Sequence, residues 1–228
     1  GSFDSPDYIE FYGEANDGWL DTALFDSANW HTNPNYSFFT DSSTYFLTWD
    51  INATTKRVTI ENDINFTNYT PSPYFLKTIR EDYTFEYANG LYQANSSSFD
   101  PEYTEAESWV GDDFSSTVSK TLNTSNIYTS GPNAQIEIGI VGRNIQQHAV
   151  EVSFASINET ISYDKTKTNF LYYSIPANNL TTNNTFFFTP TLNNDYNSIA
   201  FIDIVYPSTY NLDNTTNFEL SIPDGTGS

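Results

Sequence analysis

Eight consecutive residues near the C-terminus are Ile199-Ala200-Phe201-Ile202-Asp203-Ile204-Val205-Tyr206. Both alternating sets of positions in this stretch carry apolar side chains, whereas a strand with one solvated face alternates apolar and polar residues. The stretch therefore predicts a central strand, buried on both faces of its sheet. Asp203 is the exception, and a carboxylate at this position needs a polar partner or a place at the sheet edge.

Alternation with a period of two predicts further strands on both sides of this stretch. In residues 136–140 every second residue is Ile, and residues 148–154 place His148, two Val and a Phe at alternate positions. Other strands are expected at residues 170–175, 185–189, 198–206 and 218–222, and earlier near 8–12, 44–51, 57–61 and 74–87. Clusters of Asn, Asp, Gly, Pro and Ser separate these runs, and helical periodicity is nearly absent, so the fold is expected to be all-β.

Short strands with loops of unequal length and no fixed repeat favour a β-sandwich over a propeller or a solenoid. We expect a jelly-roll-like β-sandwich in the C-terminal half, residues 121–228. A β-rich N-terminal part, residues 1–120, is expected to pack on it or to be continuous with it. The border falls in a segment rich in Ser and Thr between Asn95 and Asn133. The alternative is one continuous β domain.

Composition excludes several classes of protein. The chain has 228 residues and a formal net charge of −21, from 29 acidic and 8 basic side chains. Such a surface repels phosphate groups, so nucleic acid and anionic membranes are not expected partners. No apolar run approaches the ~20 residues of a transmembrane helix, and none is predicted. The absence of cysteine excludes thiol catalysis and disulfides within this chain.

Composition also points to a compartment and to the kind of interior. Few lysines, no cysteine and many Asn, Thr, Ser and Tyr residues are typical of a bacterial extracytoplasmic protein. Aromatic residues make up 17% of the chain, so the interior is expected to consist largely of rings. The absence of Met and the start at Gly1-Ser2 predict a piece of a longer protein.

Four aromatic motifs follow one another in the first 50 residues. They are Tyr8-Ile9-Glu10-Phe11-Tyr12-Gly13, Asn16-Asp17-Gly18-Trp19-Leu20-Asp21, Asn35-Tyr36-Ser37-Phe38-Phe39-Thr40-Asp41 and Tyr45-Phe46-Leu47-Thr48-Trp49. In this order and spacing they resemble the region that precedes the peptidase domain in gingipain-type cysteine peptidases, above all in type IX secretion system sortases. A later element of that family is similar to Gly-Glu-Gly-Trp. In this chain Trp109 is present at the corresponding place, but both of the flanking glycines are missing.

The resemblance implies a non-catalytic N-terminal module of a secreted or outer-membrane-associated protein. In that family the nucleophilic Cys and its His lie in the following peptidase domain, so no catalytic residue is carried over to this chain. The expected partners are the downstream peptidase domain of the same chain and secreted cargo proteins. If the module caps a peptidase cleft that favours a basic side chain, Arg57, Arg80 and Arg143 are the candidate contacts.

The alternative function is that of a carbohydrate-binding module, which would recognise cell-surface glycan or lipopolysaccharide. Aromatic rings beside Asn and Asp can stack on sugars and bond their hydroxyl groups. Trp30, between Asn29 and His31, is the candidate for an exposed stacking residue, whereas Trp49 ends an expected strand and is assigned to the core.

Metal ligands and catalytic pairs are not singled out by the sequence. Asp17 and Asp21 flank a turn and could offer oxygen atoms to calcium, but Asp at a turn more often accepts local N–H bonds. His148 has apolar neighbours in its expected strand and is interpreted as a core residue; His31 has no second ligand nearby in the sequence. We therefore predict no cofactor, with calcium as the alternative, and no enzymatic activity in this chain.

Overall fold

The computed structural model describes residues 13–46, 65, 67, 70–90, 102–211 and 220–221. In this part of the chain the strands are β1 (Phe75–Asp82), β2 (Glu86–Asn89), β3 (Glu107–Val110), β4 (Val118–Asn123), β5 (Ala134–Gly142), β6 (Gln147–Phe154), β7 (Ile157–Asp164), β8 (Thr168–Ile175), β9 (Asn183–Pro190), β10 (Asn197–Ser208) and β11 (Leu220–Ser221). The helical elements are 3-10 turns, η1 (Trp19–Leu24), η2 (Ala28–Trp30) and η3 (Ala177–Asn179). The fold is all-β, as the alternation predicted.

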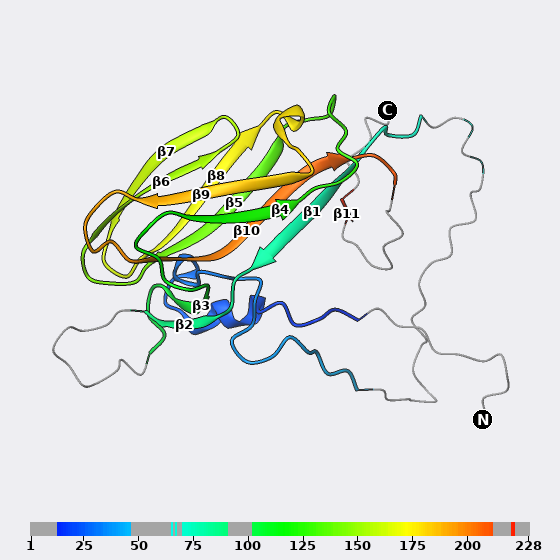
Figure 1. Cartoon of the computed structure of the whole chain (residues 1–228). Coiled ribbons are helices and arrows are strands. Elements are labelled where there is room, and N and C mark those ends of the chain that lie inside the picture. Colours follow the sequence, from blue (N-terminus) through cyan, green and yellow to red (C-terminus); the bar gives the residue numbers. More distant parts are fainter. Residues whose placement is uncertain are drawn as a thin grey trace, which may run out of the picture.

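Two antiparallel sheets form a sandwich (Figure 1). The first sheet has the order β11-β1-β10-β5-β8, and the second has the order β4-β9-β6-β7. The eight long strands have the connectivity of a jelly roll, in which the chain passes to the other sheet at every step except from β6 to β7. Strand β11 is added at the edge beside β1. Strand β1 lies in the expected N-terminal part and pairs with β10 of the sandwich. The division of the chain at residue 120, with one continuous β domain as the alternative, stays a prediction.

The expected central strand is confirmed. Strand β10 pairs with β1 on one side and β5 on the other, and nearly all of its residues are buried. From Phe201 onward its side chains alternate across the sheet, so Ile202 and Ile204 belong to the interior of the sandwich and Phe201 to a second core on the outer face. An irregularity in the pairing between Ile199 and Phe201 adds Ala200 to the same second core. Asp203 has the partner that its position required, since Arg80 on β1 donates from Nε to Oδ1 at 2.6 Å.

The interior of the sandwich differs from the expectation of a ring-based core. Branched aliphatic residues dominate it, together with rings such as Phe186 and Phe188. The aromatic residues concentrate in the N-terminal part instead. There the rings of Phe25, His31 and Phe38 contact one another with centroids 5.0–5.9 Å apart, and Phe25 and His31 are stacked. The chain therefore has two regions with differently built interiors: an aliphatic sandwich and an aromatic N-terminal part.

The N-terminal part covers one end of the outer face of the first sheet. In Figure 1 the blue 3-10 turns and the β2–β3 ribbon lie beneath the sandwich. Phe201 contributes the large ring to the second core, and Gly139 on β5 leaves the space for it. A Cβ atom on Gly139 would lie 2.5 Å from the Phe201 ring and 3.1 Å from the Thr32 carbonyl oxygen. The packing of this part on the sheet thus explains a glycine inside a buried strand.

The second and third of the four N-terminal motifs fold against each other. Gly18 has φ of 84°, and a Cβ atom there would lie 2.6 Å from the backbone of Tyr36 and Ser37. Asp21 is buried and accepts hydrogen bonds from Ser37 Oγ at 2.9 Å and from Phe38 N–H at 2.8 Å. These motif residues are therefore scaffold residues that hold two separate loops together.

Some expected strands differ from the observed ones. The strand expected at residues 74–87 is interrupted at residues 83–85 and forms β1 and β2, because β1 stays in the main sheet while β2 pairs with β3 in a separate ribbon. Strands β3, β4 and β7 were not predicted. The strands expected at residues 8–12 and 57–61, most of 44–51, and Trp49 lie outside the described residues, and β11 covers two of the residues expected at 218–222.

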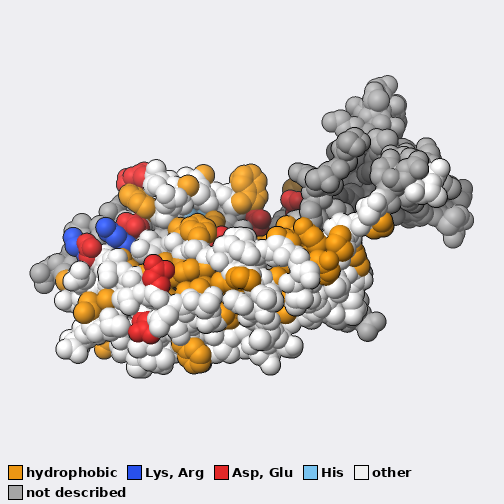
Figure 2. Space-filling view, turned by 90° about the horizontal axis from the view of Figure 1, so that it is seen from above, with side chains coloured by type: hydrophobic (Ala, Val, Ile, Leu, Met, Phe, Trp, Pro, Cys, Tyr) orange, Lys and Arg blue, Asp and Glu red, His pale blue; other side chains and the backbone are white. Residues whose placement is uncertain are grey.

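On the face seen in Figure 2, hydrophobic and acidic side chains are interspersed among backbone and side chains that are neither hydrophobic nor charged. Within the described ranges, no helix has the length and apolar character required to cross a bilayer.

Candidate functional site

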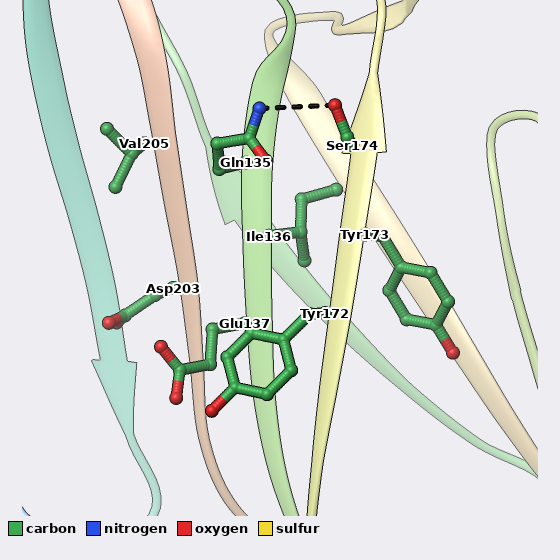
Figure 3. A pocket seen from close by; sticks show the side chains of 8 residues that line it. All are labelled: Gln135, Ile136, Glu137, Tyr172, Tyr173, Ser174, Asp203 and Val205. Carbon is green, nitrogen blue, oxygen red and sulfur yellow. Dashed lines mark hydrogen bonds between the residues drawn. The ribbon is translucent and has the colours of Figure 1, made fainter.

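Two hollows lie on the outer side of the first sheet or beside the part that covers it. The first, which we call the sheet-face hollow, has a volume of about 360 Å³ and lies over β5, β8 and β10. The side chains that face it are Gln135, Glu137, Tyr172, Ser174, Asp203 and Val205. Figure 3 shows that Ile136 and Tyr173, on the same strands, point to the opposite side of the sheet. The hollow thus lies on a part of the outer face that the described residues of the N-terminal part leave open.

Strand register arranges the side chains of the sheet-face hollow in rows across the sheet. One row runs from Arg80 on β1 through Asp203 on β10 and Glu137 on β5 to Tyr172 on β8. The next row outward contains Val205, Gln135 and Ser174 at paired positions, and Gln135 Nε2 donates to Ser174 Oγ at 3.1 Å (Figure 3). Four strands therefore bring charged, aromatic and amide groups into one patch.

Tyr172 is the exposed ring of this patch, with 69% of its surface accessible. Partial desolvation raises the pKa of its phenol, and the charge of Glu137 and a hydrogen bond to it act in the same direction. In Figure 3 the Glu137 carboxylate lies between Tyr172 and Asp203. The phenol therefore stays protonated and presents a neutral ring beside a carboxylate.

The second hollow, which we call the Trp30 hollow, has a volume of about 250 Å³. It lies between the N-terminal part and the turn that joins β7 to β8. Its lining includes Trp30 from η2, the acidic residues Asp26, Glu102 and Glu105, and the basic residues Lys165 and Lys167. Trp30 is half-buried rather than fully exposed, and it is the candidate stacking residue that the sequence indicated.

The β7–β8 turn gives the Trp30 hollow a fixed polar edge. Lys165 has φ of 62°, and its carbonyl oxygen accepts the Lys167 N–H at 3.0 Å. Thr166 between them is buried, and its hydroxyl has no hydrogen-bond partner among the described residues. Neither lysine forms an ion pair within the described ranges. The hollow therefore combines hydrogen-bond donors and acceptors with an indole ring in one lining.

His31 is a buried neutral residue of the N-terminal part. Its Nδ1 lies 2.8 Å from Thr22 Oγ1, and its Nε2 is buried without a partner among the described residues. Burial lowers the pKa of His31 to about 4, although the nearby charge of Asp21 acts in the opposite direction. This environment suits a packed ring and not a metal ligand or a proton donor.

The lowered pKa predicts a pH dependence of stability. Between about pH 6.5 and pH 4 the unfolded chain binds a proton at His31 that the folded chain does not bind. The contribution of His31 is thus complete above pH 6.5 and is lost as the pH falls to 4. We expect the free energy of unfolding to lose about 3 kcal/mol of this contribution between pH 7 and pH 4. Urea unfolding of the wild type and of His31→Phe at pH 7 and pH 4 measures it, because all other titrating groups cancel in the comparison. Parallel pH profiles of the two proteins would contradict the prediction.

His148 is the centre of a buried polar network that the sequence did not reveal. Its Nδ1 lies 2.6 Å from Asp195 Oδ1, and its Nε2 lies 3.3 Å from the Asn144 carbonyl oxygen. Asp195 also accepts the Ala149 N–H at 2.9 Å and Asn197 Nδ2 at 2.7 Å. His148 and Asp195 are fully buried, so substrate cannot reach the pair, and the network is structural. The apolar neighbours of His148 in the sequence predicted its buried position correctly. They could not reveal its partner Asp195, which is 47 residues away in the chain.

The candidate arginines of the capping hypothesis are already engaged where they are described. Arg80 forms a two-point ion pair with Asp203, and its guanidinium lies 5.0 Å above the Phe201 ring. Arg143 donates to Glu86 at 2.9 Å. Arg57 lies outside the described residues. A capping contact by Arg80 or Arg143 would require the loss of these pairs.

The two calcium candidates also have local partners. Asp17 Oδ1 accepts the Trp19 N–H at 3.2 Å, and Asp21 bonds the Ser37 loop as described above. The Asp17 contact is the local one that the turn interpretation expects, whereas the partners of Asp21 belong to a separate loop. Among the described residues, no three His, Asp or Glu side chains gather as metal ligands would. The structure does not bring Asp17 and Asp21 together with a third ligand.

Comparisons with known proteins give distant structural similarity. No protein-family model matches the chain, and no curated protein matches it in sequence. Part of dimeric latent PorU from Porphyromonas gingivalis is similar with a TM-score of 0.46 and 15% identity, over 60% of this chain and 13% of the PorU chain. The CBM36-1 domain of a multidomain xylanase from the hindgut metagenome of Trinervitermes trinervoides has a TM-score of 0.33 and 14% identity, over 57% of this chain and 95% of its own.

A carbohydrate-binding module CBM36 in complex with calcium and xylotriose is similar with a TM-score of 0.32 and 12% identity, over 55% of this chain and 98% of its own. At TM-scores below 0.5, none of these similarities assigns a function to this chain.

Proposed function

We propose that this chain is a non-catalytic accessory or prodomain-like module of a sortase-like cysteine peptidase of the type IX secretion system. The observation that carries the proposal is the use of the motif residues. Gly18, Asp21, Ser37 and Phe38 belong to the motifs that resemble this family, and all of them serve to join two loops to each other. Motifs used in this way are expected of a folded support and not of a reaction centre.

In this proposal the module positions or caps a peptidase domain that follows in the same chain. It acts outside the cytoplasm, at the cell surface or the outer membrane of a bacterium. The cysteine-free composition supports a role without thiol chemistry, because the nucleophile would have to come from another domain. The observed ion pairs of Arg80 and Arg143 favour positioning over insertion of either arginine into a cleft.

Mixing this module with the peptidase domain of its parent protein tests the proposal. We expect a complex with a dissociation constant below ~100 μM, that is, a binding free energy stronger than about −5.5 kcal/mol. Titration calorimetry measures it, and an unrelated protein of similar negative charge serves as the control for non-specific binding. A lowered peptidase activity would support capping, and binding with unchanged activity would support positioning. The absence of binding would contradict both.

A second candidate function, binding of surface glycan, is favoured by the Trp30 hollow. A sugar hydroxyl both donates and accepts hydrogen bonds. The carboxylates of the hollow can accept, and the ammonium groups of Lys165 and Lys167 can donate, while the indole ring of Trp30 packs on the apolar side of the sugar. The mixed charge of the lining matches a neutral polyhydroxylated ligand better than an ion of either sign.

A glycan array that includes the surface polysaccharide of the source bacterium tests this second function. Trp30→Ala is expected to weaken binding by roughly tenfold or more, which corresponds to ~1.4 kcal/mol. Trp19→Ala is the matched control, because Trp19 is 64% exposed and does not line the hollow. Lys165→Gln tests the same hollow at an exposed residue whose replacement leaves the packing intact. Equal binding by the Trp30 and Trp19 variants, or no binding by the wild type, would remove this function.

A further inference from the structure

We propose that the sheet-face hollow binds a basic side chain, above all an arginine, of a partner polypeptide. In this arrangement the guanidinium group packs on the exposed Tyr172 ring and pairs with the Glu137 carboxylate. The proposal does not rest on the function proposed above, because it uses neither the motif residues nor the Trp30 hollow.

Glu137 is the carboxylate in this row that has no basic partner among the described residues, although it already accepts a hydrogen bond from the Tyr172 phenol. A carboxylate has two oxygens, so Glu137 can accept further bonds from an incoming cation. Both oxygens of Asp203 are bound by the Arg80 guanidinium. Glu137 occupies the next position of the row, paired with Asp203 on one side and Tyr172 on the other. Within the described residues, no Lys or Arg forms an ion pair with Glu137. One positive charge in the row therefore faces two carboxylates, and the patch has an excess of one negative charge.

Tyr172 supplies the aromatic half of the site. The ring is 69% exposed on β8, so most of its surface is accessible to a ligand. A cation above an aromatic ring is attracted by the negative face of the ring, and arginine adds planar stacking. The hollow of about 360 Å³ beside the ring leaves room for a side chain.

The protein already contains one example of this chemistry in the same row. Arg80 packs on the Phe201 ring at 5.0 Å and donates to the neighbouring carboxylate of Asp203. An incoming arginine would repeat this arrangement with Tyr172 as the ring and Glu137 as the carboxylate. The net charge of −21 also attracts basic partners to the surface and repels acidic ones.

Chemical shift mapping by NMR with N-acetyl-L-arginine methylamide tests the site in 0.15 M NaCl. N-acetyl-L-citrulline methylamide has the same shape without the charge. We expect the arginine compound to shift the amide signals of Gln135, Glu137, Tyr172 and Ser174 at least about fivefold more than the citrulline compound. Similar shifts from the two compounds would overturn the proposal.

Four variants separate this site from general attraction to an acidic surface. Glu137→Gln and Tyr172→Leu should each reduce the arginine-induced shifts to the level seen with citrulline. Glu151→Gln on β6 removes the same charge from the other sheet, and Phe187→Ala removes a ring that is 45% exposed there. These two controls should leave the shifts within about twofold. Equal losses in Glu137→Gln and Glu151→Gln, or shifts spread evenly over the acidic surface, would overturn the proposal.

Discussion

Replacing Phe201 by alanine is expected to lower the free energy of unfolding by about 3–5 kcal/mol. Phe201 is fully buried on the outer face of β10, where it joins the N-terminal part to the sheet. Its removal would leave a cavity beside Gly139, which has no side chain to fill it, and would take the ring away from beneath Arg80. Chemical denaturation followed by tryptophan fluorescence measures the loss.

The control for this prediction is Phe187→Ala. Phe187 is 45% exposed on the second sheet, and its replacement should change the stability by no more than about 0.5 kcal/mol. Ile202→Ala offers a second comparison, because Ile202 faces the interior of the sandwich and is expected to cost about 2–5 kcal/mol. A cost below about 1 kcal/mol for Phe201→Ala would show that the second core contributes little to the fold.

The second large effect is expected for Asp195→Ala, with a loss of about 3–5 kcal/mol. Asp195 is fully buried and is bonded by His148, by the Ala149 N–H and by Asn197. Alanine would leave these three polar groups buried without their shared acceptor, and each would keep its desolvation cost. Thermal and urea denaturation measure the loss.

Two further variants show whether the loss comes from the network. Asp195→Asn keeps the size and one acceptor oxygen, so we expect a smaller loss of about 1–3 kcal/mol. Asp164→Ala makes the same truncation at an exposed residue at the end of β7 and should have little effect. A similar cost for Asp195→Ala and Asp164→Ala would contradict the role assigned to the network.

The strands that the sequence predicted correctly are the ones whose environment is visible in a short window. Strand β6 and the first half of β5 bury mainly one face against the interior, so their apolar residues recur with a period of two. Strand β10 is buried on both faces between β1 and β5, so both sets of positions are apolar. In these cases the amino-acid pattern follows directly from the number of faces that are buried.

The strands that were missed are mostly edge strands. Strands β4 and β7 are the two edges of the second sheet, and both are largely polar. An edge strand is less covered by its neighbours, so it requires fewer apolar residues and shows a weaker pattern. Strand β3 pairs only with β2 in a separate ribbon, and the Ser- and Thr-rich composition around it indicated a loop.

The candidate sites also contain some features that the sequence predicts and others that only the structure reveals. The sequence alone determined that this is an all-β, acidic, cysteine-free chain with a doubly buried central strand, and it singled out Trp30 as a ring in a polar loop. Only the tertiary structure placed Lys165 and Lys167 beside Trp30, and only the strand register placed Arg80, Asp203, Glu137 and Tyr172 in one row. The physical reason is that burial leaves a periodic pattern in each strand, whereas contacts between strands far apart in the chain depend on register and packing, which no local pattern encodes.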